Sequence, residues 1–422
     1  MYDTDVVIVG GGPAGLAAAT ACKSAGVRTL LLERGNASDN RDRYSPLEIG
    51  SGIGGAGLFS DGKFSFYPSA TNLWKLQPSR SLEIAYAWLS ALLASHDLNV
   101  PNLPIGYSVV DQANSQTGFH QKRYASFYMP LNARRALIQT LHDSLAQAVV
   151  TDAQVVSFRT EGPDVLLTLR EGSRAIRTQG NAELRAKASV MATGRLGPLL
   201  LTRCLSSQLV TFRRIEVGVR LEQDADLFFL RDNPSLDPKL ILNDPGRHVG
   251  WRTFCCCREG EIVPVIDDGI ISLSGRADVE ATGRSNVGFL VRIQEAYMGD
   301  KWDLLLARLR AHKHPLSVRL DAAESFDFLI EMFGLNLAQD ILIGITQLRQ
   351  SLEGAGLSGA TLHGPCLEGV GYYPAVDSGL RLAGLPIWVA GDTTGIFRGL
   401  TAALVSGYFV GLQVIQELAA KS

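Results

Sequence analysis

The sequence has little net charge, few cysteines and no positively charged segment ahead of its first apolar run. Its 40 Lys and Arg residues nearly balance its 42 Asp and Glu residues, so nothing favours a nucleic acid or an anionic membrane as partner. Six cysteines in 422 residues make no disulfide framework and are typical of a cytoplasmic protein with reduced thiols. Asp3 and Asp5 precede a short apolar run, so no signal peptide is expected.

No long hydrophobic run is typical of a membrane span. The charge-free stretch Gly399–Gln416 contains three glycines, two glutamines, a serine and a threonine, which favours a buried helix over a transmembrane one. The chain has no repeat of fixed period and no low-complexity tract. With 46% hydrophobic and 19% charged residues, it has the composition of a globular protein, and its length suits two or three domains.

A glycine-rich segment follows the first apolar run. In VVIVGGGPAG, Val6–Val9 form a β-branched run typical of a buried parallel strand. Gly10, Gly12 and Gly15 then have the spacing G-x-G-x-x-G. A helix-like segment follows, and a second strand ends at Glu33, near the position, about 20 residues on, where dinucleotide-binding folds place an acidic residue. The context predicts a Rossmann-type dinucleotide site, with an unrelated glycine-rich turn as the alternative.

Each glycine of this motif has a physical role in such a site. Gly10 allows the tight turn, Gly12 lets the backbone approach a pyrophosphate, and Gly15 lets the helix pack close to the strand. The helix that begins at Pro13 and Ala14 offers unpaired N–H groups and a partial positive charge to the phosphates.

Glu33 is expected to accept hydrogen bonds from a ribose diol. A carboxylate at this position also repels a 2′-phosphate, which argues against NADP. The next residue, Arg34, is assigned to the same binding segment. The N-terminal motif alone does not separate NAD from FAD.

The C-terminal segment PIWVAGDTTGIFRGLTAALVSG resembles the corresponding element of FAD enzymes of the glutathione-reductase type. A short strand, Ile387–Ala390, is followed by Gly391 and Asp392 and then by the charge-free helix. The resemblance implies FAD as cofactor and Asp392 as the ligand of a ribityl hydroxyl; the alternative for Asp392 is a turn residue or helix cap. The positive end of the helix would stabilise negative charge on a reduced flavin. The backbone N–H groups assigned to the flavin are those of Gly399, Leu400 and Thr401.

Two further strands are assigned to FAD by the same resemblance. The segment VMATGRLGP runs from a strand into a turn at Ala192, Thr193 and Gly194. The predicted strand Gln154–Phe158 would place Val155 against the adenine.

The segment GSGIGGAGLFSDGKF, Gly50–Phe64, resembles a bacterial family of FAD-dependent dehydrogenases whose members carry GGAG-x-FSDGK after the second strand. The segments VGVRLE, RTFCCC and GDTTGIFRGLTAALVSG also recur in that family. The family pattern continues as TFC-x-C-P, whereas Arg258 follows Cys257 in this chain.

The GGAG segment has a physical interpretation as well. Gly54 and Gly55 allow a backbone to pass close to a flat ring, and Ala56 is assigned to the same contact. Lys63 would then stabilise an anionic reduced flavin or hold a substrate anion. The alternative is a surface salt bridge between Asp61 and Lys63.

Cys255, Cys256 and Cys257 lie in a predicted strand. Alternation would turn Cys255 and Cys257 to one face and Cys256 to the other. The three make no C-x-x-C pair, no companion cluster indicates zinc, and no metal site is expected. Packing is one interpretation, because free Cys is among the most buried residue types. The other places a thiol over the flavin, so Cys255 and Cys257 join Lys63 as catalytic candidates.

Two other flavin classes and a second nucleotide domain lack support in the sequence. Aromatic hydroxylases of this fold carry a D-G pair where this chain has Thr193 and Gly194, and the W-x-W-x-I-P segment of flavin halogenases is absent. No second G-x-G-x-x-G follows a strand, so the electron partner stays open. The sequence favours an FAD-dependent dehydrogenase or reductase that transfers a hydride between a small organic substrate and flavin N5. An FAD-dependent monooxygenase and a non-catalytic flavin-binding protein are the alternatives.

The predicted fold class is α/β plus α+β: a Rossmann-type FAD-binding domain with an inserted, mainly antiparallel substrate domain. The FAD-binding domain is expected to be discontinuous, over residues 1–75, 130–215 and 385–422. Residues 76–129 and 216–384 are assigned to the substrate-binding or lid domain.

Overall fold

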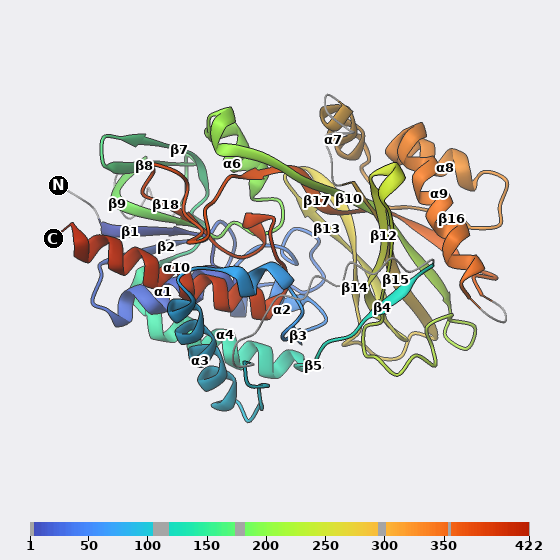
Figure 1. Ribbon diagram of the computed structural model, residues 1–422, viewed down its shortest axis with the longest axis horizontal. Coiled ribbons are helices and arrows are strands. Elements are labelled where there is room, and N and C mark those ends of the chain that lie inside the picture. Colours follow the sequence, from blue (N-terminus) through green and yellow to red (C-terminus); the bar gives the residue numbers. More distant parts are fainter. Residues whose placement is uncertain (1–3, 104–117, 174–181, 294–300, 353–355, 422) are drawn as a thin grey trace. The chain divides into compact units, whose positions relative to one another are not determined.

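The computed structural model describes residues 4–103, 118–173, 182–293, 301–352 and 356–421 (Figure 1). The chain divides into two compact units. Unit 1 comprises residues 1–110, 124–211 and 372–422, and unit 2 comprises residues 111–123 and 212–371.

A mixed sheet forms the centre of unit 1. Within the described residues its strand order is β6-β2-β1-β9-β8-β7, and β18 pairs with β9. The strands are β1 (Thr4–Val9), β2 (Thr29–Leu32), β6 (Val149–Val150), β7 (Val155–Glu161), β8 (Asp164–Leu169), β9 (Glu183–Met191) and β18 (Ile387–Val389). Parallel pairing joins β6, β2, β1, β9 and β18, whereas β7, β8 and β9 pair antiparallel. The predicted central strand is confirmed, with Val7 and Ile8 fully buried.

Helices pack on this sheet, and α1 and α10 pack closely on each other. The helices of unit 1 are α1 (Pro13–Ser24), α2 (Gly55–Phe59), α3 (Ser79–Ala94), α4 (Leu131–Leu145), α6 (Pro198–Cys204) and α10 (Leu400–Ala420). A separate two-stranded antiparallel sheet pairs β3 (Lys63–Ser65) with β5 (Ser126–Tyr128). A Cβ at Gly407 of α10 would lie 2.0 Å from the carbonyl oxygen of Ala14, and one at Gly411 would lie 2.6 Å from Cβ of Ala21. Only glycine allows α10 to approach α1 this closely.

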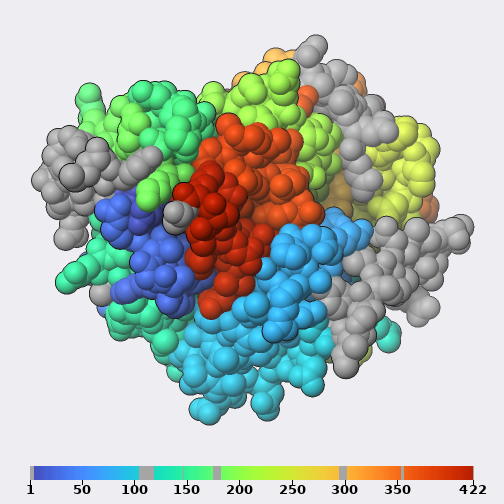
Figure 2. Space-filling view, turned by 60° about the vertical axis from the view of Figure 1, so that its left-hand side comes forward, coloured from blue at the N-terminus to red at the C-terminus, as the bar shows by residue number. Residues whose placement is uncertain are grey.

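The charge-free C-terminal segment forms α10. By length and composition it could cross a membrane, and 56% of its most apolar window is buried within the structure. Figure 2 shows the C-terminal residues in red between the N-terminal residues in dark blue and those around α3 in light blue. Trp88 of α3 stacks on Tyr408 of α10, with ring centroids 4.4 Å apart.

The position of α3 corrects a predicted boundary. Residues 76–103 were assigned from the sequence to the inserted domain, but they belong to unit 1. The reason is the partner of α3, which comes from the other end of the chain. Besides the Trp88–Tyr408 stack, Gln413 donates a hydrogen bond to the hydroxyl of Ser81 at 3.0 Å.

Unit 2 is built on an antiparallel sheet, as the sequence predicts for the inserted part. Its strand order within the described residues is β16-β17-β10-β15-β12-β11-β4. The strands are β4 (His120–Lys122), β10 (Val210–Asp224), β11 (Lys239–Asp244), β12 (Val249–Cys257), β15 (Arg284–Ile293), β16 (Leu316–Arg319) and β17 (Thr361–Pro374). A separate hairpin joins β13 (Glu261–Asp267) to β14 (Ile270–Arg276).

One face of this sheet is the core of unit 2. Val217, Val219 and Leu221 alternate along β10 and are fully buried. The helices are α7 (Lys301–Ala311), α8 (Ser325–Phe333) and α9 (Leu335–Gln350). Trp251 of β12 packs on α9, where its Nε1 donates to the carbonyl oxygen of Asp340 at 2.8 Å. The opposite face therefore carries the polar side chains of β10, β12 and β15.

Candidate functional site

The glycine-rich turn after β1 brings β1, β9 and α1 together. Gly10 has φ +107°, and a Cβ there would lie 2.3 Å from the carbonyl oxygen of Ala192. A Cβ at Gly15 would lie 1.8 Å from the carbonyl oxygen of Gly10. Both positions therefore require glycine, for the physical reasons that the G-x-G-x-x-G spacing implies.

The GGAG segment lies against this turn. The N–H of Gly54 donates to the carbonyl oxygen of Gly11 at 2.8 Å. A Cβ at Gly55 would lie 3.0 Å from Cα of Gly12. Gly54 and Gly55 both have positive φ, and α2 begins at Gly55. Two motifs that are separate in the sequence are thus parts of one backbone surface at the start of α1.

Glu33 fixes the geometry of this surface. Its Oε2 accepts from the N–H of Gly11 at 2.6 Å, and its Oε1 accepts from Gly35 at 2.8 Å and Gly52 at 2.9 Å. The side chain is buried. Three backbone donors leave a carboxylate with room for a further donor, since its two oxygens have about four acceptor positions. Glu33 thus connects the glycine-rich turn to the loop that contains Gly35 and Gly52, a role that the sequence pattern does not reveal.

Arg41 completes the loop after β2. Its Nη1 donates to the carbonyl oxygen of Ile53 at 2.8 Å, and its Nε donates to that of Glu48 at 3.2 Å. Burial lowers the pKa of Arg41 to about 10, against the opposing charges of Glu33 and Glu48. Arg41 was not predicted from the sequence because its partners are backbone carbonyl groups, which every residue type carries. Arg34, which the sequence assigns to the site, is an exposed side chain.

The ends of β9 and β18 lie beside the same turn. The N–H of Ala192 donates to the carbonyl oxygen of Val9 at 2.8 Å. The hydroxyl of Thr393 donates to the carbonyl oxygen of Gly194 at 3.2 Å and lies 3.4 Å from that of Thr193. Asp392 forms an ion pair with Arg398, with Nε 3.3 Å from Oδ2. The predicted turn 192–194 and the predicted segment 391–392 are therefore neighbours.

The start of α10 contacts strand β3, which carries Lys63. Gly399 has φ +105°, and α10 begins after it without a side-chain cap. The N–H of Ser65 donates to the hydroxyl of Thr401 at 3.2 Å. Lys63, two residues earlier, donates from Nζ to the hydroxyl of Tyr124 at 3.3 Å. Leu400 lies against α2, because a Cβ at Gly57 would be 2.4 Å from its Cδ2.

Val155 lies at the start of β7. It is 6% exposed and packs in the cluster that includes Leu32 and Val9. The chain reaches it from Ala153, whose N–H donates to the carbonyl oxygen of Glu33 at 2.9 Å. The contact with an adenine stays a prediction.

The donor set of unit 1 fits FAD. The N-cap residues of α1 and α10 are Gly12 and Gly399, which provide no side-chain cap, and neither helix has an acidic residue in its first turn. Their first N–H groups therefore present a partial positive charge. A pyrophosphate suits the first helix, and an electron-rich flavin edge suits the second. Glu33 and Asp392 supply carboxylate acceptors, which hydroxyl groups of ribose and ribityl require.

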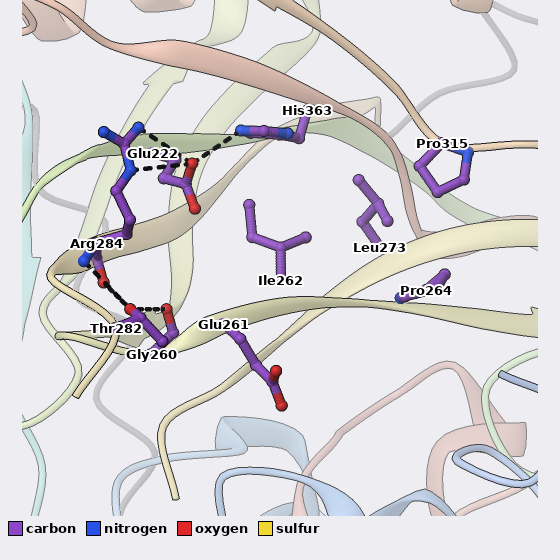
Figure 3. Close-up of a pocket in the computed structure, with 10 residues that line it drawn as sticks. All are labelled: Glu222, Gly260, Glu261, Ile262, Pro264, Leu273, Thr282, Arg284, Pro315 and His363. Carbon is purple, nitrogen blue, oxygen red and sulfur yellow. Dashed lines mark hydrogen bonds and ion pairs between the residues drawn. The ribbon is translucent and has the colours of Figure 1, made fainter. Parts of the chain in front are cut away.

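Unit 2 holds a cavity of about 340 Å³ (Figure 3). Glu222 accepts from Nε2 of His363 at 3.2 Å and pairs with Arg284 at 3.1 Å. Burial acts to raise the pKa of Glu222, but the hydrogen bonds and charges of His363 and Arg284 outweigh it and hold the pKa below its usual range. None of the site residues predicted from the sequence lines this cavity. The motif VGVRLE, which ends at Glu222, is the signal that pointed to this strand.

A group of basic side chains, the cation cluster, surrounds the buried Glu216 on the polar face of the sheet in unit 2. Arg252 lies 2.8 Å and Arg214 lies 3.5 Å from Oε2 of Glu216, and Arg292 pairs with its other oxygen. Lys239 lies next to them; burial and repulsion by neighbouring cations lower its pKa well below the ordinary value. The cluster consists of Lys122, Arg214, Lys239, Arg252 and Arg292.

Cys255 and Cys257 lie on the same side of β12, as the sequence predicts, but not through regular alternation. Cys255 has φ +50°, and the pairing of β12 with β15 shifts register between Phe254 and Cys257. This bulge brings the two sulfur atoms to 3.8 Å. Cys256 is buried, and burial raises the pKa of its thiol to about 12. The cysteines belong to unit 2, whereas Lys63 belongs to unit 1.

Comparison with known proteins identifies the N-terminal segment. Residues 5–37 match the family of FAD dependent oxidoreductases. This span covers β1, the glycine-rich turn, α1, β2 and Glu33. The protein is an FAD-dependent oxidoreductase, and its cofactor is FAD. No curated protein matches the chain.

Solved structures of other flavoproteins align over almost the whole chain. A flavoprotein/dehydrogenase from Cytophaga hutchinsonii is 15% identical, with a TM-score of 0.40, 99% of this chain covered and 79% of the other. A geranylgeranyl bacteriochlorophyll reductase-like protein from Thermoplasma acidophilum is 13% identical, with a TM-score of 0.41 and the same coverage. An anhydrotetracycline hydroxylase from Streptomyces rimosus is 13% identical, with a TM-score of 0.40. This chain is covered to 99% and spans only 63% of the hydroxylase.

Proposed function

We propose that this FAD-dependent oxidoreductase is a dehydrogenase or reductase that transfers a hydride between a small organic substrate and its flavin. The observation that carries the proposal is the convergence, within unit 1, of the Gly10–Gly15 turn, the GGAG segment and the start of α10. When bound, FAD supplies a two-electron centre whose N5 accepts or donates the hydride.

The residues of the first helix start and of Glu33 would hold the nucleotide half. The backbone at Gly12 would approach the pyrophosphate, and the N–H groups of the first turn of α1 would bind its oxygens. Glu33, already fixed by three backbone donors, would accept from a ribose hydroxyl. Asp392 would accept from the ribityl chain, with Arg398 orienting its carboxylate.

Lys63 is the first choice for a polar group near the reacting atoms. It lies on β3, whose Ser65 is hydrogen-bonded to Thr401 in the first turn of α10. Its ammonium group is placed by the hydroxyl of Tyr124. A cation and a helix N-terminus together would stabilise negative charge that arrives in the site during the reaction.

The cation cluster of unit 2 supports an anionic substrate. Three arginines, Arg214, Arg252 and Arg292, gather around the carboxylate of Glu216, and guanidinium groups bind a carboxylate or phosphate well. We expect Arg292→Met to raise KM about tenfold with kcat little changed, because the contact would act before the chemical step. Arg308→Met, an exposed arginine of the same unit, is the matched control and should leave both constants unchanged.

One experiment separates this proposal from a monooxygenase. The purified protein is mixed anaerobically with candidate substrates, the flavin absorbance is followed, and labelled oxygen is then admitted. A dehydrogenase is reduced by its substrate before oxygen enters. Label in the product, together with a need for a separate reductant, would overturn the proposal. Thr193, which stands where aromatic hydroxylases carry an aspartate, favours the first outcome.

Variants test the assigned residues in the same assay. Asp392→Ala should weaken FAD retention by about tenfold to a hundredfold, the effect of losing a hydrogen bond to a charged group. Lys63→Met should slow flavin reduction by about a hundredfold, and Lys63→Arg should restore part of the rate. Lys75→Met, an exposed lysine of unit 1, serves as the control. Equal rates in the Lys63 and Lys75 variants would remove Lys63 from the site.

A further inference from the structure

Arg220 is a buried cation in unit 2 whose described hydrogen-bonding partners are an amide oxygen, a carbonyl oxygen and a sulfur atom. Its side chain is fully buried. Nε donates to Oδ1 of Asn286 at 2.7 Å, and Nη2 donates to the carbonyl oxygen of Cys255 at 2.7 Å. Nη2 also lies 3.8 Å from Sγ of Cys257. Nη1 is buried without a hydrogen-bonding partner, and none of the described partners of Arg220 is a carboxylate.

A guanidinium group in this position requires an anion. Arginine stays protonated in proteins, and a buried charge is costly unless it is paired. A sulfur atom that can become negative lies beside Arg220: Sγ of Cys257 is 3.8 Å from Nη2, and Sγ of Cys255 is 3.8 Å from Sγ of Cys257. Burial acts to lower the pKa of Arg220, but the nearby cysteines outweigh it and the pKa is raised.

The backbone around the two sulfurs is shaped to hold them together. Their 3.8 Å separation is van der Waals contact, and a disulfide needs about 2.05 Å. The bulge and the left-handed conformation of Cys255 create this contact. Such a conformation is unfavourable for a residue other than glycine and persists only where the surroundings enforce it. A Cβ at Gly275 would lie 2.3 Å from Nη2 of Arg220 and 2.6 Å from Sγ of Cys257. The neighbouring hairpin therefore leaves space for this group of side chains.

We propose that Cys255 and Cys257 are a redox-active dithiol, and that Arg220 holds one of the two sulfurs as a thiolate. The oxidant is a low-molecular-weight disulfide. All of its residues lie in unit 2, and the proposed step does not use the flavin.

The exchange proceeds in two steps. Cys255 is half-buried and Cys257 is fully buried, so the thiolate of Cys255 attacks the external disulfide, forms a mixed disulfide and releases one thiolate. Cys257 then loses its proton, attacks Sγ of Cys255, and releases the second thiolate. The protein starts with one thiolate and one thiol, so it loses two electrons and one proton. The external disulfide becomes two thiols by taking up that proton and a second one from solvent. In the oxidised state Arg220 loses its anionic partner, so the reduced form is stabilised and the pair is readily reduced again.

The chain contains its own controls. Cys256 is buried, its N–H donates to Oδ1 of Asp237 at 2.9 Å, and the pKa of its thiol is raised to about 12. Cys366 is also buried, and its thiol donates to the carbonyl oxygen of Leu273 at 3.4 Å. Neither is expected to react at neutral pH.

The test is oxidation of the full-length protein in buffers with graded ratios of reduced to oxidised glutathione at pH 7. Free thiols are trapped with iodoacetamide, and peptides are analysed by mass spectrometry. We expect a disulfide between Cys255 and Cys257 in the wild type, in Cys256→Ser and in Cys366→Ser. Cys257→Ser should stop at a glutathione adduct on Cys255. Absence of the 255–257 disulfide from the wild type at every ratio would overturn the proposal.

The role of Arg220 has a separate readout, the rate at which the 255–257 disulfide forms at a fixed glutathione ratio and pH 7. Arg220→Met should slow this rate about tenfold, because the thiolate loses its neighbouring cation. Arg220→Lys should recover much of the rate. Equal rates in the wild type, Arg220→Met and Arg220→Lys would exclude a thiolate held by Arg220.

Discussion

Replacement of Glu33 by alanine should destabilise the protein even when no FAD is bound. The carboxylate accepts three backbone hydrogen bonds, from Gly11, Gly35 and Gly52. The bonds from Gly11 and Gly52 are buried, so their N–H groups would be left without an acceptor. An unsatisfied buried donor costs about 1–3 kcal/mol. The expected loss is about 2–6 kcal/mol, a large part of the 5–15 kcal/mol that a typical protein has.

The measurement is urea unfolding of the FAD-free protein, followed by circular dichroism. Glu33→Ala should unfold at a clearly lower urea concentration than the wild type, and its FAD retention should also fall. Glu33→Gln should be intermediate, since one side-chain oxygen can still accept while the amide group faces a donor. Glu83→Ala on α3, whose side chain is 49% exposed, is the matched control and should change neither property.

Refutation would come from the FAD-free protein. If Glu33 only binds ribose, Glu33→Ala leaves the unfolding midpoint of the FAD-free protein unchanged and lowers FAD affinity alone. That result would mean that the three backbone bonds contribute nothing net. The hydrogen bonds of Glu33 would then not be the reason for the fixed geometry of the turn.

Three other substitutions test the frame around the site. Arg28 holds the pKa of Asp5 at about 2. The stability that the ionised carboxylate supplies is therefore complete above pH 4 and is lost as the pH falls toward 2. In urea unfolding, Asp5→Asn should be less stable than the wild type at pH 6 and equal to it near pH 2. Gly407→Ala should cost on the order of 1–3 kcal/mol, read as a lower melting temperature, because its Cβ would meet the backbone of Ala14. Thr401→Val removes the acceptor for the N–H of Ser65 and should lower FAD retention several-fold, measured by flavin release on dilution.

The first βαβ element could be predicted because all of its signals are local. The apolar run of β1, the spacing of Gly10, Gly12 and Gly15, and Glu33 at the end of β2 lie within one short segment. The family match covers the same segment, residues 5–37. The structure adds that Glu33 accepts a hydrogen bond from Gly52. Gly52 lies in a loop, and local sequence patterns do not predict the path of that loop.

The assignment of α3 was wrong for a related reason. Its sequence is that of an ordinary amphipathic helix, and this pattern does not indicate which part of the protein the helix packs against. That surface belongs to α10, through Trp88 on Tyr408 and Gln413 on Ser81. A domain boundary is set by such contacts between distant segments, so composition alone placed it too early in the chain.

The cysteine segment shows how a correct prediction can rest on an incorrect reason. Alternation along a regular strand predicts a shared face for Cys255 and Cys257, but it also predicts that their side chains are separated by a full two-residue repeat. The observed contact depends on a bulge, on positive φ at Cys255, and on the space at Gly275. Arg220, from another strand, fills that space together with the sulfurs. Interpreting one strand at a time cannot predict this group of residues, because Arg220, the two cysteines and Gly275 come together only when β10, β12 and β14 are assembled.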